Sequence, residues 1–382
     1  MNNFRIFILY LISIFIAGYT IFSEILGVEI TYIVQMTCFI ICCFWALQYL
    51  FKDRNCSYIN VSLIVIGIVF LYNMLTEFST TQFRTLSFSL LMGIPFYMFS
   101  LNDQHVKKLF IIICTLSIVS EFYNLNLGRN EYGEGYYGGG YFASVTLPIG
   151  LYLMRNKSTL IKTFWCFFIF TLVIYAVKRG DILGIIIAIV SYYIAMVKLE
   201  NSISRIKVLI NFVILTVLIF FIFQFALESS ELLQNRLEST EEKNFSGRDT
   251  IYTTLWNIWY NGDFTRQFLG FGINAPLKFV GKPAHNDWLE FLLDMGIVGF
   301  CLYMSLFVTF FKSFKAKYVN NKLRVIFIPI LCIWFVKSIF SMYLFSMSTP
   351  LLSMIIGYML NPYVNYYIDN ESDDVIEYFD ET

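Results

Sequence analysis

Charged residues are scarce in this sequence: Asp, Glu, Lys and Arg together make up 14% of the 382 residues, whereas hydrophobic residues make up 58%. This balance excludes a water-soluble globule and is typical of a protein that crosses a membrane several times. There is no block of basic residues, so nucleic acid is not expected as a partner. The eight cysteines lie almost entirely in apolar segments and form no Cys-x-x-Cys pair, which indicates packing residues rather than disulfides or metal ligands.

The apolar residues form about twelve runs that reach or approach the length needed to cross the hydrocarbon layer. These runs lie at residues 4–22, 29–51, 60–78, 85–101, 108–125, 141–154, 160–177, 182–198, 206–226, 287–311, 324–345 and 349–368. We therefore predict an all-α polytopic membrane protein with about twelve transmembrane helices and one large extracytoplasmic loop. The first run has no small-residue cleavage site, so we interpret it as a retained helix rather than a signal peptide.

The runs divide the chain into four predicted parts. A transmembrane bundle of about nine helices covers residues 1–226, and a large loop with amphipathic helices covers residues 227–284. Helices ten to twelve cover residues 285–368, and an acidic cytoplasmic tail covers residues 369–382.

Lys and Arg are distributed unevenly among the connections. If the amino terminus is cytoplasmic, most of them fall in cytoplasmic segments, and the short outer connections carry only Arg84, Arg129, Lys178 and Arg179. The positive-inside rule then places both termini in the cytoplasm and the large loop outside.

Two outer connections have an unusual composition. The connection at residues 128–141, which contains Arg129, is rich in Gly and Tyr; it suits either a mobile loop that stacks on a sugar ring or a flexible linker with tyrosines at the membrane interface. Lys178 and Arg179 are two adjacent cations at the outer membrane edge, where they either bind an anion or simply extend from the helix ends toward water.

Residues 246–300 concentrate the polar chemistry of the chain. Ser246 is predicted to cap a helix that begins near Arg248 and carries an apolar face. The members of this face are Ile251, Leu255, Ile258 and Trp259. Such an amphipathic helix is expected to lie flat on the membrane surface, which would hold Arg248 near the headgroups.

His285 stands just before the helix predicted from residue 287, with Asn286 as its cap. The positive end of a helix dipole disfavours imidazolium, so we expect a neutral ring that is able to accept a proton. A histidine that only satisfies local hydrogen bonds fits this position equally well.

Acidic residues recur along one face of the same predicted helix, at Asp287, Glu290 and Asp294. Lys337 is the only Lys or Arg well inside a predicted span, at about the same depth as Asp294. Because an unpaired charge at that depth is costly, we expect Lys337 and Asp294 to pair or to line a wet cavity.

Several of these motifs resemble, in order and spacing, the O-antigen polymerase and O-antigen ligase superfamily of bacterial polysaccharide assembly. They are Lys178-Arg179-Gly180, Ser246-Gly247-Arg248-Asp249, Leu269-Gly270-Phe271-Gly272, His285-Asn286-Asp287-Trp288-Leu289 and Asp294-Met295-Gly296-Ile297-Val298-Gly299. The resemblance covers about residues 128–311, and it departs from the family pattern at Asp181 and Glu290.

The resemblance implies a glycosyltransferase with a GT-C-like architecture in the bacterial cytoplasmic (inner) membrane. It implies that no metal or cofactor is needed and that undecaprenyl-diphosphate-linked oligosaccharides serve as donor and acceptor. By the resemblance, Arg179 and Arg248 bind the lipid diphosphate and His285 engages the acceptor hydroxyl. The further substrate-binding candidates are Lys178, Arg129, Asp287, Glu290 and Lys337.

The residue types also fit this chemistry on their own. A sugar that leaves a lipid diphosphate develops negative charge on phosphate oxygens, and guanidinium groups supply paired donors there. A neutral histidine can orient or deprotonate the acceptor hydroxyl.

Three functions remain open at this point. The leading hypothesis is a polymerase that transfers glycan to the non-reducing end of a lipid-linked repeat unit in O-antigen, capsule or exopolysaccharide assembly, with a chain-length regulator and a flippase as candidate partners. The alternative is a ligase that transfers polymer to lipid A-core or to protein. A transporter or flippase is less favoured, because the halves show no internal repeat and the long outer loop is asymmetric.

Overall fold

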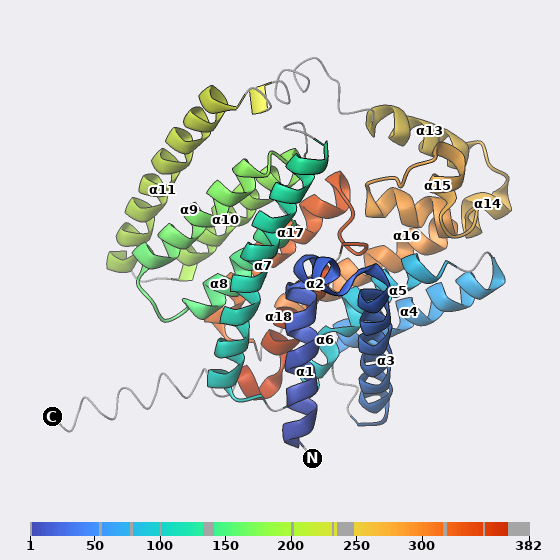
Figure 1. Cartoon of the computed structure of the whole chain (residues 1–382), viewed down its shortest axis with the longest axis horizontal. Helices are drawn as coiled ribbons and strands as arrows, with labels where there is room; N and C mark the ends of the chain where they lie inside the picture. The colour runs from blue at the N-terminus through green and yellow to red at the C-terminus, as the bar shows by residue number, and fades with distance from the viewer. Residues whose placement is uncertain are drawn as a thin grey trace.

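The computed structural model describes residues 2–52, 56–76, 79–99, 101–132, 141–199, 202–230, 233–234, 248–315, 319–346 and 348–365. Within these ranges the chain forms helices and short connections and contains no strand, which confirms the all-α prediction (Figure 1).

The helices of the first third are α1 (Asn2–Ala17), α2 (Tyr19–Leu26), α3 (Val28–Lys52), α4 (Ser57–Leu75), α5 (Thr80–Leu91) and α6 (Gly93–Met98). The next helices are α7 (Asp103–Tyr132), α8 (Tyr141–Leu153), α9 (Thr159–Tyr175), α10 (Arg179–Leu199) and α11 (Ser202–Ser229). The predicted loop contains the short helices α13 (Arg248–Tyr260), α14 (Phe264–Leu269) and α15 (Ala275–Val280). The last helices are α16 (Asp287–Phe314), α17 (Asn321–Phe340) and α18 (Thr349–Leu360).

Among the described residues, seven helices are long and apolar enough to cross a membrane: α3, α4, α7, α10, α11, α16 and α17. The pair α1 and α2 is bent by 85° and would count as an eighth span if the two form one. The predicted runs at α8, α9 and α18 fold as shorter apolar helices, and the run at residues 85–101 is split between α5 and α6. The chain is therefore a multi-pass membrane protein, with fewer full-length spans than the sequence runs suggest.

The last helix of the bundle, α18, lies at its centre. Every residue from Thr349 to Leu360 is buried. Its backbone touches α6 where Gly357 meets Gly93, because a Cβ on Gly357 would overlap the Gly93 carbonyl. Small residues permit this kind of close helix crossing in membrane proteins.

The loop helices and α16 form one group at an edge of the bundle (Figure 1). The apolar face predicted on α13 exists, and it packs against α16; the expected position of this helix on the membrane surface stays a prediction. Leu255 is fully buried there in a cluster with Leu289 and Leu293 of α16, and Ile258 and Trp259 pack against this cluster. The amphipathic pattern reveals an apolar face, but it does not identify what covers that face.

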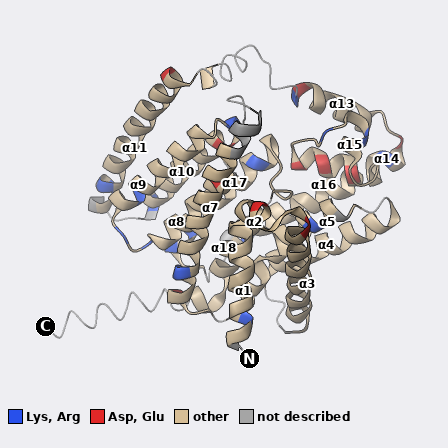
Figure 2. Ribbon diagram, viewed as in Figure 1, with Lys and Arg blue, Asp and Glu red and all other residues tan. Residues whose placement is uncertain are grey.

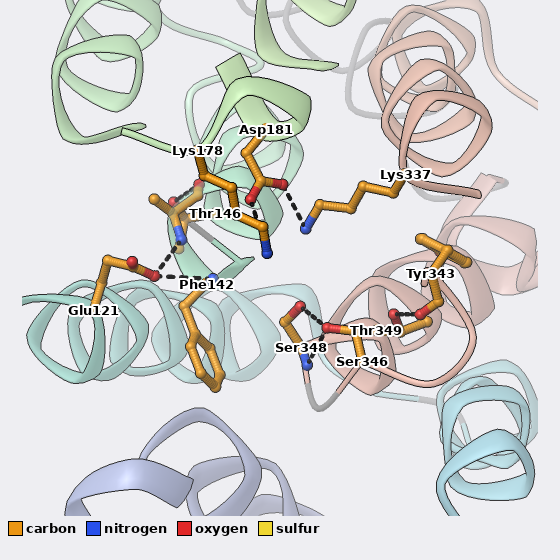
Figure 3. A network of polar contacts seen from close by, with 11 residues as sticks. Glu121, Phe142, Thr146, Lys178, Asp181, Lys337, Tyr343, Ser346, Ser348 and Thr349 are labelled. Atoms are coloured by element: carbon orange, nitrogen blue, oxygen red, sulfur yellow. Dashed lines mark hydrogen bonds and ion pairs between the residues drawn. The ribbon is translucent and has the colours of Figure 1, made fainter. Parts of the chain in front are cut away.

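A buried ion pair joins α10 to α17. Nζ of Lys337 lies 3.3 Å from Oδ1 of Asp181, and Nζ of Lys178 lies 3.7 Å from Oδ2 of the same carboxylate. Figure 3 shows Lys178 and Lys337 approaching Asp181 from different sides. The side chains of Asp181 and Lys337 are 1% and 3% exposed.

The expected pair between Lys337 and Asp294 is wrong. The Asp294 carboxylate instead accepts hydrogen bonds from the Ala275 amide at 2.9 Å and from Nε2 of Gln82 at 3.3 Å. Equal depth along two helices places charges at the same level, but it does not determine the direction in which each side chain points.

Lys337→Met should lower the stability of the protein in detergent by about 3 kcal/mol, because Asp181 would stay buried with only the more distant Lys178 beside it. Adding Asp181→Asn to that variant should recover part of this loss, which thermal and denaturant unfolding would measure.

The double variant with Asp294→Asn and Lys337→Met is the matched control. The stability changes that the two substitutions cause separately should add in this variant. The observed pairing would be contradicted if the stability changes of Lys337→Met and Asp294→Asn were not additive while those of Lys337→Met and Asp181→Asn were additive.

Candidate functional site

The backbone of the loop is bound to α16 at a break in that helix. Gly296 has φ 63° and ψ −153°, which are not helical values. Just before the break, the amide of Phe271 donates to the Leu293 carbonyl at 2.8 Å, and the amide of Gly272 donates to the Asp294 carbonyl at 3.0 Å. The loop therefore satisfies carbonyl groups that the broken helix leaves without an intrahelical partner.

Glycine is required on both sides of this contact. Gly270 has φ 84°, and a Cβ there would overlap the backbone of Asp294. A Cβ on Gly296 would overlap the carbonyl groups of Gln267 and Phe268. Two motifs that are separate in the sequence thus form one interlocked contact, the Gly270–Gly296 contact, which only residues without a side chain allow.

The first turns of α16 carry the three predicted carboxylates, and all three are buried on one side of the helix. Asp287, Glu290 and Asp294 are 0%, 2% and 4% exposed. Glu290 accepts from the Ala284 amide at 2.8 Å, as Asp294 does from Ala275. Figure 2 shows these acidic residues of α16 beside the loop helices. The carboxylates of Glu290 and Asp294 thus bind the backbone of the loop to α16, at Ala284 and Ala275.

Asp287 holds a different segment. Its Oδ2 accepts hydrogen bonds from the Tyr303 hydroxyl at 3.0 Å and from the amides of Tyr343 and Leu344 at 3.0 and 3.2 Å. This carboxylate fixes the turn between α17 and α18. The role of Asp287 and Glu290 in substrate binding stays a prediction.

The start of α13 docks on the end of α17. The guanidinium of Arg248 donates to the Phe340 carbonyl, and the Tyr252 hydroxyl one turn later donates to the Ile339 carbonyl at 3.2 Å. Gly180 at the start of α10 lies against the same place, because a Cβ there would be 3.4 Å from Cβ of Phe340. Residues 180, 248 and 340 therefore meet at one end of the bundle.

His285 lies at the same end of the bundle, where its backbone carbonyl is bound by Tyr252. It has φ 54°, an uncommon value for a residue with a side chain. The Tyr252 hydroxyl donates to its carbonyl at 3.1 Å. Asn286 follows as the predicted helix cap, and its side chain accepts from the Leu289 amide at 3.0 Å. The capping prediction is confirmed.

The surroundings of His285 favour the neutral form of its ring. Burial lowers its pKa from 6.5, and the positive charges of Arg248, Lys178 and Lys282 lower it further. The direction agrees with the sequence expectation, and burial is the largest cause. The same interactions show that Lys178 and Arg248 lie close enough to act on the imidazole.

The structure thus brings together Lys178, Arg248 and His285, and it places Arg179 next to Lys178 at the first position of α10. Lys337 reaches the same end of the bundle through Asp181. Arg129 lies near the end of α7 rather than in a loop, and the positions of its side chain, of residues 133–140 and of Ser246 lie outside the described structure.

Two residues that hold the parts of the candidate site together were missed by sequence reasoning. Asp181 was noted only as a departure from a family pattern, yet it is the counter-ion of two lysines. Tyr252 joins α13 to both His285 and α17, and its position one turn after Arg248 was the only local signal for it. Both roles depend on partners far away in the chain.

Comparison with known families gives a match for residues 164–304, to a family described as O-antigen ligase. The matched stretch begins within α9 and ends within α16, so it contains Arg179, Arg248 and His285 but not Lys337. No curated protein matches the chain. The match, on a chain with several apolar helices, supports membership of the O-antigen polymerase and ligase superfamily, whose members are glycosyltransferase-like enzymes.

Proposed function

We propose that this protein is a polysaccharide polymerase that transfers a glycan from a polyprenyl diphosphate to a hydroxyl of a lipid-linked repeat unit. The observation that carries the proposal is the meeting of Arg248, Lys178 and a neutral His285 at one end of α10 and α17. The family match over residues 164–304 supports the same reaction class.

The cations would act on the leaving group. As the bond between the anomeric carbon and the phosphate oxygen breaks, the electron pair stays on the lipid diphosphate, where negative charge grows. Arg248 uses part of its guanidinium to bond Phe340, and its other N–H donors are available for phosphate oxygens. Arg179 and Lys178 would complete the diphosphate site, which makes the proposed reaction independent of a divalent metal.

His285 would act on the acceptor. The acceptor oxygen forms the new bond to the anomeric carbon while its proton passes to the neutral imidazole. The cations that bind the diphosphate also keep this imidazole unprotonated, because a positive ring beside them is unfavourable. The same cations therefore act on both the departing diphosphate and the proton transfer from the acceptor hydroxyl.

A ligase is the second candidate, and the match to the O-antigen ligase family favours it. It would use the same donor and the same residues, with lipid A-core or a protein hydroxyl as acceptor. Deletion of the gene separates the two: loss of a polymerase leaves single repeat units on the surface, whereas loss of a ligase leaves polymer on the lipid carrier.

The proposal includes a location. Following the positive-inside rule, we place about twelve spans of a GT-C-like architecture in the bacterial cytoplasmic membrane, with both termini in the cytoplasm and the site outside. Undecaprenyl-diphosphate-linked oligosaccharides, a chain-length regulator and a flippase are the proposed partners.

The purified protein should elongate synthetic lipid-linked repeat units with a chelator present. Arg248→Ala and His285→Ala should each reduce the rate about a hundredfold or more, because each removes a group that acts in the transition state. Arg266→Ala is the matched control, since Arg266 is an exposed loop arginine, and it should keep the rate. Full activity of both site variants, or flipping of the lipid without chain growth, would refute the proposal.

The rate should fall on the acid side as His285 becomes protonated, with a midpoint below pH 6.5 because its folded pKa is lowered. Lys282→Gln removes one of the cations responsible, so the pKa of His285 should rise and the midpoint should move to higher pH, with little change in the maximum rate.

Lys278→Gln, another loop lysine, is not among the charges that lower this pKa and should leave the pH profile in place. A midpoint that moves to lower pH in Lys282→Gln would contradict the assignment of His285 as the base.

A further inference from the structure

A polar cavity lies between α10 and α17, at the ends of these helices that are opposite to the candidate site. It has a volume of about 290 Å³, whereas a single water needs about 10–15 Å³ by a similar measure. Lys322 and Lys337 are fifteen residues apart on α17, so at 1.5 Å per residue the cavity is roughly 23 Å from the buried ion pair. It is therefore a separate site.

The charges around this cavity are all positive. Arg155, Lys162 and Lys322 line it, and none of the described lining residues is acidic. Arg155 and Lys162 are only 8% and 7% exposed, so two cations are largely withdrawn from water at one opening. Charges at such a depth are costly unless they have a function or a partner.

Arg155 has a carboxylate partner, Asp103, at the edge of this group. Asp103 accepts from Arg155 at 2.9 Å and pairs with Lys107 at 2.5 Å, and it also accepts from the hydroxyls of Tyr152 and Tyr358. Asp103 is thus shared between Arg155, which lines the cavity, and Lys107, which does not. An anion inside the cavity would face Lys162 and Lys322 as well as Arg155.

The rest of the lining consists of the apolar residues Leu151, Met196, Val325 and Ile326 together with Tyr192 and Asn321. The first turns of α9 next to Lys162 expose Leu160, Ile161 and Phe164, which are 48%, 44% and 58% exposed. A membrane would cover such a surface. The cavity therefore combines a cationic pocket with apolar surroundings at the edge of the bilayer.

We propose that this cavity binds a phosphate group, held by Arg155, Lys162 and Lys322 between the ends of α8, α9, α10 and α17. In the membrane the phosphate is that of an anionic phospholipid headgroup, because basic pockets between helices at the positive side of a membrane protein suit such headgroups. The inference does not depend on the proposed glycosyl transfer, since it concerns different residues at the other end of the bundle.

The test is native mass spectrometry of the full-length protein in nonionic detergent with phosphatidylglycerol or phosphatidylcholine. Phosphatidylglycerol should be retained in preference to phosphatidylcholine, and Lys162→Gln or Lys322→Gln should each weaken its binding about tenfold. Lys322 is exposed, so its replacement leaves the fold intact, and Lys162→Arg should retain binding because it keeps the charge.

Lys207→Gln is the matched control. Lys207 is exposed near the start of α11, at the same end of the bundle, and does not line the cavity. A loss in Lys207→Gln as large as in Lys322→Gln, or no loss in either cavity variant, would overturn the proposal.

Thermal unfolding with inorganic phosphate, compared with chloride at equal ionic strength, distinguishes a lipid headgroup from free phosphate as the ligand of the cavity. Stabilisation by phosphatidylglycerol but not by inorganic phosphate supports a lipid headgroup. Stabilisation of the wild type by inorganic phosphate, absent in Lys322→Gln, supports the same cavity with a free phosphate as its ligand.

Discussion

The Gly270–Gly296 contact is the constraint on which the candidate site and the loop around it depend. At this point the loop and α16 approach so closely that no side chain fits on either backbone. The contact fixes where the loop returns to the bundle, and the amides of Phe271 and Gly272 bond to the carbonyls that precede the break. Glu290 and Asp294 extend the attachment by binding Ala284 and Ala275, so the backbone leading to His285 has little freedom.

The candidate site follows from this attachment. With α13 packed on α16 through Leu255, Arg248 and Tyr252 reach the end of α17, where α10 also begins. Three positive side chains then surround a half-buried histidine, and the same charges that suit a diphosphate keep the imidazole neutral. The buried pair of Asp181 and Lys337 joins the two helices that carry this end of the bundle. In the proposed reaction, diphosphate binding, proton transfer and helix packing depend on one set of charges.

Local signals in the sequence predicted the features that are determined locally. The apolar runs predicted helices because a span needs continuous hydrophobicity, and Asn286 predicted a cap because capping involves residues within one turn. The shared face of Asp287, Glu290 and Asp294 followed from helical periodicity in the same way. The partners of these groups could not be predicted, because Lys337 with Asp181, Tyr252 with Ile339 and the face of α13 with α16 are long-range contacts. The count of about twelve spans is not confirmed by the described residues, since several of the apolar runs fold as short or bent helices.

The central claim is that the cations at the start of α10 and the loop histidine lie on one side of the membrane, with the phosphate-binding cavity on the other. Labelling by a membrane-impermeant thiol reagent tests it most directly, using single cysteines in place of Lys178, Lys282 and Lys322 in a protein whose native cysteines have been replaced. Lys178→Cys and Lys282→Cys should react in intact spheroplasts, and Lys322→Cys should react only after the membrane is opened. Labelling of the first two from opposite sides would contradict the account.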